Sequence, residues 1–268
     1  MVTQSIFLGP KELELILTLE SEDKKIFTFS DAKGILETTD SSVRNIIYRL
    51  KGKNRITEIE KGKYVLSPAK SGVEGLWVEH PFLIVPHLID EYYIGFWSAM
   101  NYWGMSEQIP RTVFVAARRR KRQIKYGNQE FKFIILSKKK FFGFVQEKIE
   151  DFMFNISSRE KTIIDGLMHP EYCGGISEVA KALWNAKDEL NWGELTETVD
   201  RIGISAVDRR LGYLLDTLGI QEDIVKKLSK KDFLGFRWLD PSGNKKILKY
   251  SRKWGLKVNL SDEEVIVR

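Results

Sequence analysis

Residues 30–68 read SDAKGILETTDSSVRNIIYRLKGKNRITEIEKGKYVLSP, and this stretch decides the fold of the first part of the chain. Ser30 can cap a short helix over 31–37, because a serine side chain accepts hydrogen bonds from the first backbone N–H groups of a helix. Two threonines then form a tight turn. The stretch therefore opens with a helix and a turn, and a second helix follows.

The second helix is expected over about 42–51, with Asp40 or Ser41 as its cap. Its apolar residues recur at the spacing of one helical face: Val43, Ile46, Ile47 and Leu50. The other face carries Ser41, Asn45 and Tyr48, with Arg44 and Arg49 at its edges. Side chains of these types hydrogen-bond base edges and phosphates. A protein-binding helix would be expected to show an apolar patch there, so the face favours DNA.

Two short β-prone runs follow, over 55–60 and 63–66. Gly62 between them supplies the positive φ that a tight hairpin needs, and Lys61 makes the tip basic. The order of helix, turn, polar-faced helix and basic hairpin is that of a winged helix-turn-helix. A small helix–hairpin module for protein contacts is the alternative interpretation.

The flanking sequence completes this first domain. Pro10 opens a further helix over 11–19, and the β-prone residues 24–29 can add a third strand. Residues 69–75 are small and polar, which is typical of a domain boundary. We therefore expect a DNA-binding domain over 1–68 and a second domain over 75–268.

Composition fits two domains and an intracellular setting. The chain has 268 residues, of which 43% are hydrophobic, and a net charge of +6 that permits nucleic-acid binding. Cys173 is the only cysteine, so no internal disulfide can form. No apolar run approaches the roughly 20 residues of a membrane span, and no signal peptide is evident. We expect a cytoplasmic protein without membrane contact.

The middle of the chain is expected to be rich in strands. Pro81 and Pro86 favour an extended segment, and residues 90–103 are predicted to form an aromatic helix that Gly104 ends. The aromatic stripe is expected to lie in the core, although it could stack bases. β-prone runs follow over 111–117, 122–126, 130–137 and 141–146. An antiparallel sheet packed by the aromatic helix is the natural interpretation.

The densest positive charge in the chain lies between two of these strands. It comprises Arg118, Arg119, Arg120, Arg122 and Lys125, together with Lys121 and the three lysines 138–140. One hypothesis is a second surface that binds the phosphates of nucleic acid. The other is a solvated loop whose charges protect strand edges from pairing. The sequence leaves both open.

The last third of the chain is predicted to be mainly helical. Helices are expected over 157–168, where the first residues have capping-box spacing, and over 176–187, 192–201, 205–218 and 223–228. The tail alternates enough to form strands. The fold class is therefore α+β, with the winged helix-turn-helix followed by a larger mixed α/β domain that is β-rich over 75–150, helical over 151–230 and strand-like over 231–268.

Ordered short strings in the second domain resemble the AbiEi antitoxin proteins. They are Tyr93-Ile94-Gly95-Phe96-Trp97-Ser98-Ala99, Tyr102-Trp103-Gly104, Gln108-Ile109-Pro110, Phe142-Gly143, Ser158-x-Glu160-Lys161-Thr162-x-x-Asp165, Gly174-Gly175 and Arg209-Arg210-Leu211-Gly212-Tyr213-Leu214-Leu215. The resemblance covers nearly the whole chain and keeps the order of the strings.

This resemblance implies a prokaryotic autorepressor with an N-terminal winged helix and a C-terminal antitoxin domain. It implies binding to operator repeats in double-stranded DNA. It also implies a nucleotidyltransferase toxin, AbiEii, as the functional partner in a type IV system, in which antitoxin and toxin need not bind each other. The DNA-reading residues of the family correspond here to Ser41, Ser42, Arg44, Asn45, Tyr48, Arg49, Lys61 and Lys63. A stand-alone regulator of the same architecture is the alternative.

Enzyme chemistry has weak support in the sequence. Glu130-Phe131-Lys132 imitates half of a metal-dependent nuclease motif, but no Asp lies between Asp90 and Asp151 to complete it. The three histidines lack metal-ligand spacing. There is no P-loop and no GxGxxG, so no cofactor is expected. A nuclease-like enzyme targeted by a winged helix is the competing function.

Overall fold

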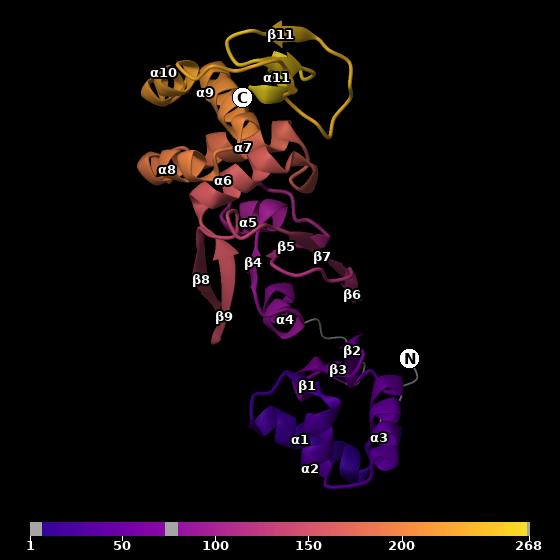
Figure 1. Ribbon diagram of the computed structural model, residues 1–268. Helices are drawn as coiled ribbons and strands as arrows, with labels where there is room; N and C mark the ends of the chain where they lie inside the picture. Colours follow the sequence, from indigo (N-terminus) through magenta and orange to yellow (C-terminus); the bar gives the residue numbers. More distant parts are fainter. Residues whose placement is uncertain (1–6, 73–79, 267–268) are drawn as a thin grey trace. The chain divides into compact units, whose positions relative to one another are not determined.

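The computed structural model describes residues 7–72 and 80–266 (Figure 1). The chain divides into two compact units. The first contains the residues up to Asp90 together with Gln123–Phe131, and the second contains Glu91–Arg122 and the residues from Lys132 onward. Residues 73–75 of the expected domain boundary lie outside the described residues. The chain is a mixed α+β protein, in which N-terminal helices and a small sheet precede a larger α/β region.

The first unit combines helices with a three-stranded antiparallel sheet. Its main elements are α1 (Pro10–Ser21), β1 (Ile26–Thr28), α2 (Phe29–Leu36), α3 (Asp40–Gly52), β2 (Ile56–Glu60) and β3 (Lys63–Leu66), and the strands lie in the order β1-β3-β2. The predicted apolar face of α3 is confirmed, because Val43, Ile46, Ile47 and Leu50 are all buried in one core with Leu15 of α1.

Helix α2 begins earlier than the sequence predicted. The cap is Thr28 rather than Ser30, because the Thr28 hydroxyl accepts from the Asp31 N–H at 3.2 Å. The Asp31 carboxylate accepts in return from the Thr28 N–H at 2.7 Å. Helix α3 is capped in the same way by Thr39, whose hydroxyl accepts from the Ser42 N–H at 3.3 Å. Both caps lie outside the positions predicted from serine and aspartate alone.

The segment with two prolines is a helix rather than an extended strand. Helix α4 (Pro81–Leu88) starts with Pro81 at its first position, where the missing N–H costs no hydrogen bond. The His80 side chain accepts from the Phe82 N–H at 3.3 Å through Nδ1. Pro86 lies inside the helix, and apolar residues around it are buried. Burial of this segment therefore outweighed the local preference of the prolines.

A six-stranded mixed sheet forms the middle of the chain. Its strand order is β6 (Ile124–Tyr126), β7 (Gln129–Ile135), β5 (Thr112–Ala117), β4 (Tyr92–Ile94), β9 (Phe152–Ser157) and β8 (Phe144–Ile149). Strands β4 and β9 pair in parallel, with Ile94 opposite Ile156, so the expected antiparallel sheet is mixed. Strand β9 falls within the region that the sequence assigned to helices.

The predicted aromatic helix over 90–103 is wrong in its first half. Tyr92–Ile94 is the central strand β4, and only Phe96–Tyr102 forms a helix, α5. Tyr93 and Ile94 are fully buried. An apolar run buried on both faces has no period that separates strand from helix. The expectation that the aromatic stripe lies in the core is confirmed for Tyr92, Tyr93 and Phe96.

The predicted helices of the last third are confirmed to within a few residues at each end. They are α6 (Arg159–Met168), α7 (Ile176–Ala186), α8 (Trp192–Ile202), α9 (Ser205–Leu218) and α10 (Glu222–Ser229). A short sheet with the order β10 (Arg237–Trp238), β12 (Leu256–Val258) and β11 (Lys249–Ser251) follows, and α11 (Asp262–Val265) ends the described chain. Figure 1 shows helices α6 to α9 between the six-stranded sheet and this terminal sheet. Within the described ranges, no helix combines the length and the apolar character that crossing a membrane requires.

Candidate nucleic-acid interface

The polar face of α3 projects into solvent. Tyr48 is 79% exposed, which is unusual for an aromatic side chain on a helix whose other face is fully buried. Ser41, Arg44 and Asn45 are also exposed, and Ser42 is half-buried. The Arg44 guanidinium carbon lies 5.8 Å from the centre of the Phe29 ring, a cation–π contact that places the charged end of this side chain beside α2. The face therefore offers amide, phenol and guanidinium groups together.

Arg49 is held differently from its neighbours on α3. Its Nε lies 2.6 Å from Oε1 of Glu12 on α1, and Lys53 Nζ lies 2.6 Å from Oε2 of the same carboxylate. The Gly9 N–H donates to Glu12 Oε2 at 2.9 Å. Glu12 is only 1% exposed. Arg49 thus connects α3 to α1, and half of its side chain remains in solvent.

The Glu12 carboxylate is stabilised in its charged form. Burial alone would raise its pKa, but the hydrogen bonds from Lys53, the Gly9 N–H and Arg49 outweigh burial and lower the pKa below the ordinary value of 4.5. A lowered folded-state pKa adds stability above the ordinary carboxyl pKa, and this stability is lost as pH falls through the folded value.

Replacing Glu12 by Gln is expected to cost about 1.5–3 kcal/mol at neutral pH, because charge-assisted hydrogen bonds are lost. The cost should shrink as pH falls below 4.5, because the carboxyl of the unfolded chain is protonated there while the native carboxyl keeps its charge until pH reaches its lower folded-state pKa. Hydrogen exchange of the α1 and α3 amides, compared between variant and native chain at each pH, measures this. A cost that stays the same down to the acid limit would contradict the role of the Glu12 charge.

The tip of the β2–β3 hairpin is built around Gly62. Its φ is +75°, and its N–H donates to Glu58 Oε1 at 3.2 Å. Lys61 is exposed beside it. Lys63 instead donates from Nζ to the His87 carbonyl oxygen at 2.7 Å, so it connects the hairpin to α4. The two lysines therefore differ in their availability to a ligand.

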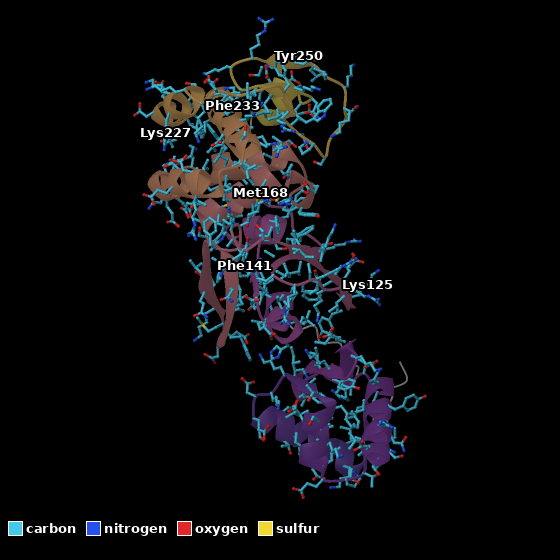
Figure 2. The ribbon with its side chains drawn as sticks, viewed as in Figure 1. Lys125, Phe141, Met168, Lys227, Phe233 and Tyr250 are labelled. Atoms are coloured by element: carbon cyan, nitrogen blue, oxygen red, sulfur yellow. The ribbon has the colours of Figure 1, made fainter. Side chains whose placement is uncertain are left out.

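The second basic cluster does not form one set of side chains within one unit. Arg118 donates from Nη1 to the Leu136 carbonyl at 2.6 Å and is half-buried. Arg119, Arg120 and Arg122 are exposed in the same unit. Lys125, by contrast, belongs to the first unit and pairs with Glu130 at 2.9 Å (Figure 2).

A buried charged cluster lies elsewhere in the second unit, and sequence reasoning did not single it out as a site. Lys161 and Asp165 of α6 and Tyr93 of β4 are all 0% exposed. Lys161 Nζ donates to Tyr93 Oη at 2.8 Å and also forms an ion pair with Asp165. Tyr93 Oη donates to Asp165 Oδ2 at 2.8 Å. We refer to Tyr93, Lys161 and Asp165 as the buried triad.

The surroundings of the buried triad are aromatic and close. The Phe142 ring centre lies 5.7 Å from Lys161 Nζ, and the Arg201 guanidinium lies 3.6 Å from that ring centre. A Cβ on Gly143 would lie 3.2 Å from Lys161 Cβ, and Gly143 has φ +70°. Burial lowers the pKa of Lys161 and raises that of Tyr93 well above its ordinary value. Three of the strings that resemble AbiEi proteins therefore meet at one place.

No protein-family model and no curated protein matches this sequence. The comparison with solved structures gives a different result. The chain shares its fold with the Rv2827c protein of Mycobacterium tuberculosis. The similarity to that crystal structure has a TM-score of 0.72 and covers 97% of this chain and 95% of Rv2827c, at 12% sequence identity. At this identity the likeness to Rv2827c shows a shared fold and nothing more.

In the nuclease-like string Glu130-Phe131-Lys132, both charged side chains already contact other residues of the protein. Glu130 accepts from Gln123 Nε2 at 2.7 Å besides its ion pair with Lys125, and Lys132 Nζ lies 4.8 Å from the centre of the Tyr172 ring. In the described ranges, no three His, Cys, Asp or Glu side chains gather where they could hold a metal ion.

A sequence signal for the buried triad did exist: a Lys and an Asp four residues apart on one helix, embedded in apolar sequence.

Proposed function

We propose that the chain is a DNA-binding transcriptional regulator, in which α2, α3 and the β2–β3 hairpin act as a winged helix-turn-helix. The observation that carries this function is the exposed polar face of α3, where Tyr48 is 79% exposed while Val43 and Leu50 are fully buried. A helix of this kind fits the major groove, where Asn pairs with adenine and Arg with guanine. The structural similarity to Rv2827c supports the fold of this chain. Because the two sequences are only 12% identical, it adds no argument about function.

We assign a role to each residue of the proposed interface from the contacts that its side chain already makes within the protein. Arg44, Asn45 and Tyr48 are the base-reading residues, since they point away from the core of the first unit. Ser41, Ser42 and Lys61 contact phosphates from the start of α3 and the hairpin tip. Arg49 and Lys63 act mainly as positioning residues, because Glu12 and the His87 carbonyl already hold them.

Within this function, the chain acts as the antitoxin and autorepressor of an AbiE-like type IV system. Its functional partner is then a nucleotidyltransferase toxin that it need not touch. Support comes from the strings that resemble AbiEi proteins: Tyr93, Phe142-Gly143 and Lys161 to Asp165 converge on one buried cluster. If this chain and the AbiEi proteins have a structural core in common, the matching strings should keep their order in the sequence and meet in space, as these three strings do.

A reporter placed behind the DNA upstream of the chain's own gene tests this function. The native chain should repress the reporter, and the Asn45→Ala, Tyr48→Ala double variant should lose repression while remaining at native abundance. Leu17→Ala is the matched control, because Leu17 is 53% exposed and belongs to α1 of the same unit rather than to the α3 face. Full repression by the double variant would contradict the proposed interface. Co-expression with a nucleotidyltransferase encoded beside the gene tests the antitoxin activity separately.

A further inference from the structure

One short segment near the C-terminus carries a strong excess of cations, in addition to the basic cluster around Arg118–Arg122. Residues 236–258 hold seven of the 43 Lys and Arg and one of the 37 Asp and Glu, and the remaining 36 of each cancel. The cations are Arg237, Lys245, Lys246, Lys249, Arg252, Lys253 and Lys257. The single acid, Asp240, is buried, so it does not offset them at the surface.

This segment forms the terminal sheet, and the two faces of that sheet differ in chemistry. Leu256 and Val258 of the central strand β12 are fully buried in the core. Lys257 between them faces the other way, with Trp238 of β10 and Tyr250 of β11 directly opposite it on the two neighbouring strands. Paired residues on adjacent strands share a face. The outer face therefore carries a Trp, a Lys and a Tyr in one row.

Further aromatic and basic groups extend this row. Phe236 packs edge-on against Tyr250 with ring centres 5.1 Å apart. Lys245 and Lys257 place their ammonium groups 5.2 Å and 5.4 Å from the centre of the Trp238 ring. Phe236 is 42% exposed and Tyr250 55%. Tyr250 lies on β11, in the sheet at the C-terminal end of the second unit (Figure 2).

Two of the seven cations are neutralised locally, and the others are not. Lys249 pairs with Asp262 at 2.6 Å, and Lys253 pairs with Asp216 at 2.8 Å. Arg237, Lys246 and Arg252 are exposed, and no carboxylate of the described residues pairs with them. Adjacent unpaired cations repel one another, so an anionic ligand that neutralises several of them is favoured.

The sheet that carries these groups is held firmly. The Asp240 carboxylate accepts from the Ile176 N–H at 2.9 Å and from the Ser242 N–H at 2.8 Å. Asn259 donates from Nδ2 to the Asp240 carbonyl at 2.8 Å. Beneath the sheet, Trp254 donates from Nε1 to Asp216 of α9 at 2.9 Å. Because the sheet is already rigid, it loses little conformational entropy when a ligand binds.

From these observations we infer that the outer face of the terminal sheet binds single-stranded nucleic acid. Unstacked bases lie against Tyr250 and Phe236, and the backbone phosphates meet the exposed Lys246 and Arg252. Exposed rings interleaved with cations on a sheet suit a single strand, because its bases are free to stack on protein rings while those of a duplex already stack on each other. This surface is separate from the α3 face and needs a different ligand.

Fluorescence anisotropy of the full chain with labelled oligo(dT) and oligo(U) of about 15 nucleotides tests this, since such a length spans a typical single-strand site. Tyr250→Ala should weaken binding roughly ten-fold, and Tyr250→Leu should weaken it similarly because it keeps bulk but not the ring. Tyr250→Phe should keep native affinity. Met153→Ala is the matched control, since Met153 is 51% exposed on β9 and away from the terminal sheet.

A charge test runs beside the aromatic one. The Lys246→Ala, Arg252→Ala double variant should reduce the slope of log Kd against log salt by roughly 1.4, at about 0.7 per lost phosphate contact on a single strand. The Lys226→Ala, Lys230→Ala variant removes the same charge from α10 and its C-cap and should leave that slope unchanged. Preference for oligo(dT) or oligo(U) assigns DNA or RNA as the ligand. No binding of either oligonucleotide at low salt, or native affinity of Tyr250→Ala, would overturn the inference. Asn45→Ala should leave this binding intact, which separates it from the α3 interface.

Discussion

Lys161→Met is expected to destabilise the second unit by about 3–5 kcal/mol, because it leaves the Asp165 carboxylate buried without its ionic partner. Both side chains of the pair are fully buried, and Tyr93 donates to the same carboxylate. The remaining tyrosine hydrogen bond cannot replace the charge. Urea unfolding followed by tryptophan fluorescence measures the loss, since six of the seven Trp residues lie in the second unit.

The matched control replaces both ions. A Lys161→Met, Asp165→Leu double variant leaves no uncompensated charge, and buried ion pairs exchanged for apolar residues of similar volume are often close to neutral. The double variant should therefore recover most of the stability that Lys161→Met loses. If the single and double variants were equally unstable, packing around the long lysine side chain would explain the result and the charge pairing would not.

Gly212→Ala is expected to cost roughly 3 kcal/mol or more, because the added methyl has no room. A Cβ at this position of α9 would lie 2.1 Å from Trp254 Cζ3 and within 2.5 Å of two further ring atoms. Trp254 is only 1% exposed and is held by Asp216, so its ring cannot move aside without disturbing the terminal sheet. Thermal unfolding followed by circular dichroism reports the loss.

Gly34→Ala on α2 is expected to have the opposite effect on the stability of the same chain. No atom lies within 4 Å of a Cβ at Gly34, so the substitution should stabilise the helix by about 0.5–1 kcal/mol through reduced backbone entropy in the unfolded state. A Gly212→Ala variant as stable as Gly34→Ala would contradict the packing of α9 against Trp254.

The elements that the sequence predicted well are those with a clear period. Val43, Ile46, Ile47 and Leu50 repeat at helical spacing, and the structure buries all four. The prediction of a helix over Tyr92–Ile94 was wrong, because a strand buried on both faces shows no alternation of apolar and polar residues. Pro81 and Pro86 misled the prediction because a proline in the first turn of a helix is favourable, and burial of the α4 segment compensates for the second.

The candidate sites follow the same division. The exposed α3 face could be read from the sequence, because it is the complement of a periodic apolar face. The partners of Arg49 and Lys63 could not, since Glu12 and His87 are 37 and 24 residues away along the chain. The row formed by Trp238, Lys257 and Tyr250 depends on strand register. Register between short strands is set by tertiary packing, so no local pattern reveals it.

The interface on α3 is tested most directly by titrating the full chain with two duplexes, the DNA upstream of its own gene and a scrambled duplex of equal length. Asn45→Ala should weaken binding to the upstream duplex by on the order of 1–3 kcal/mol and leave binding to the scrambled duplex unchanged, because a base-reading contact carries specificity and a phosphate contact does not. Equal affinity of native chain and Asn45→Ala for the upstream duplex would contradict the assignment of α3 as the reading helix.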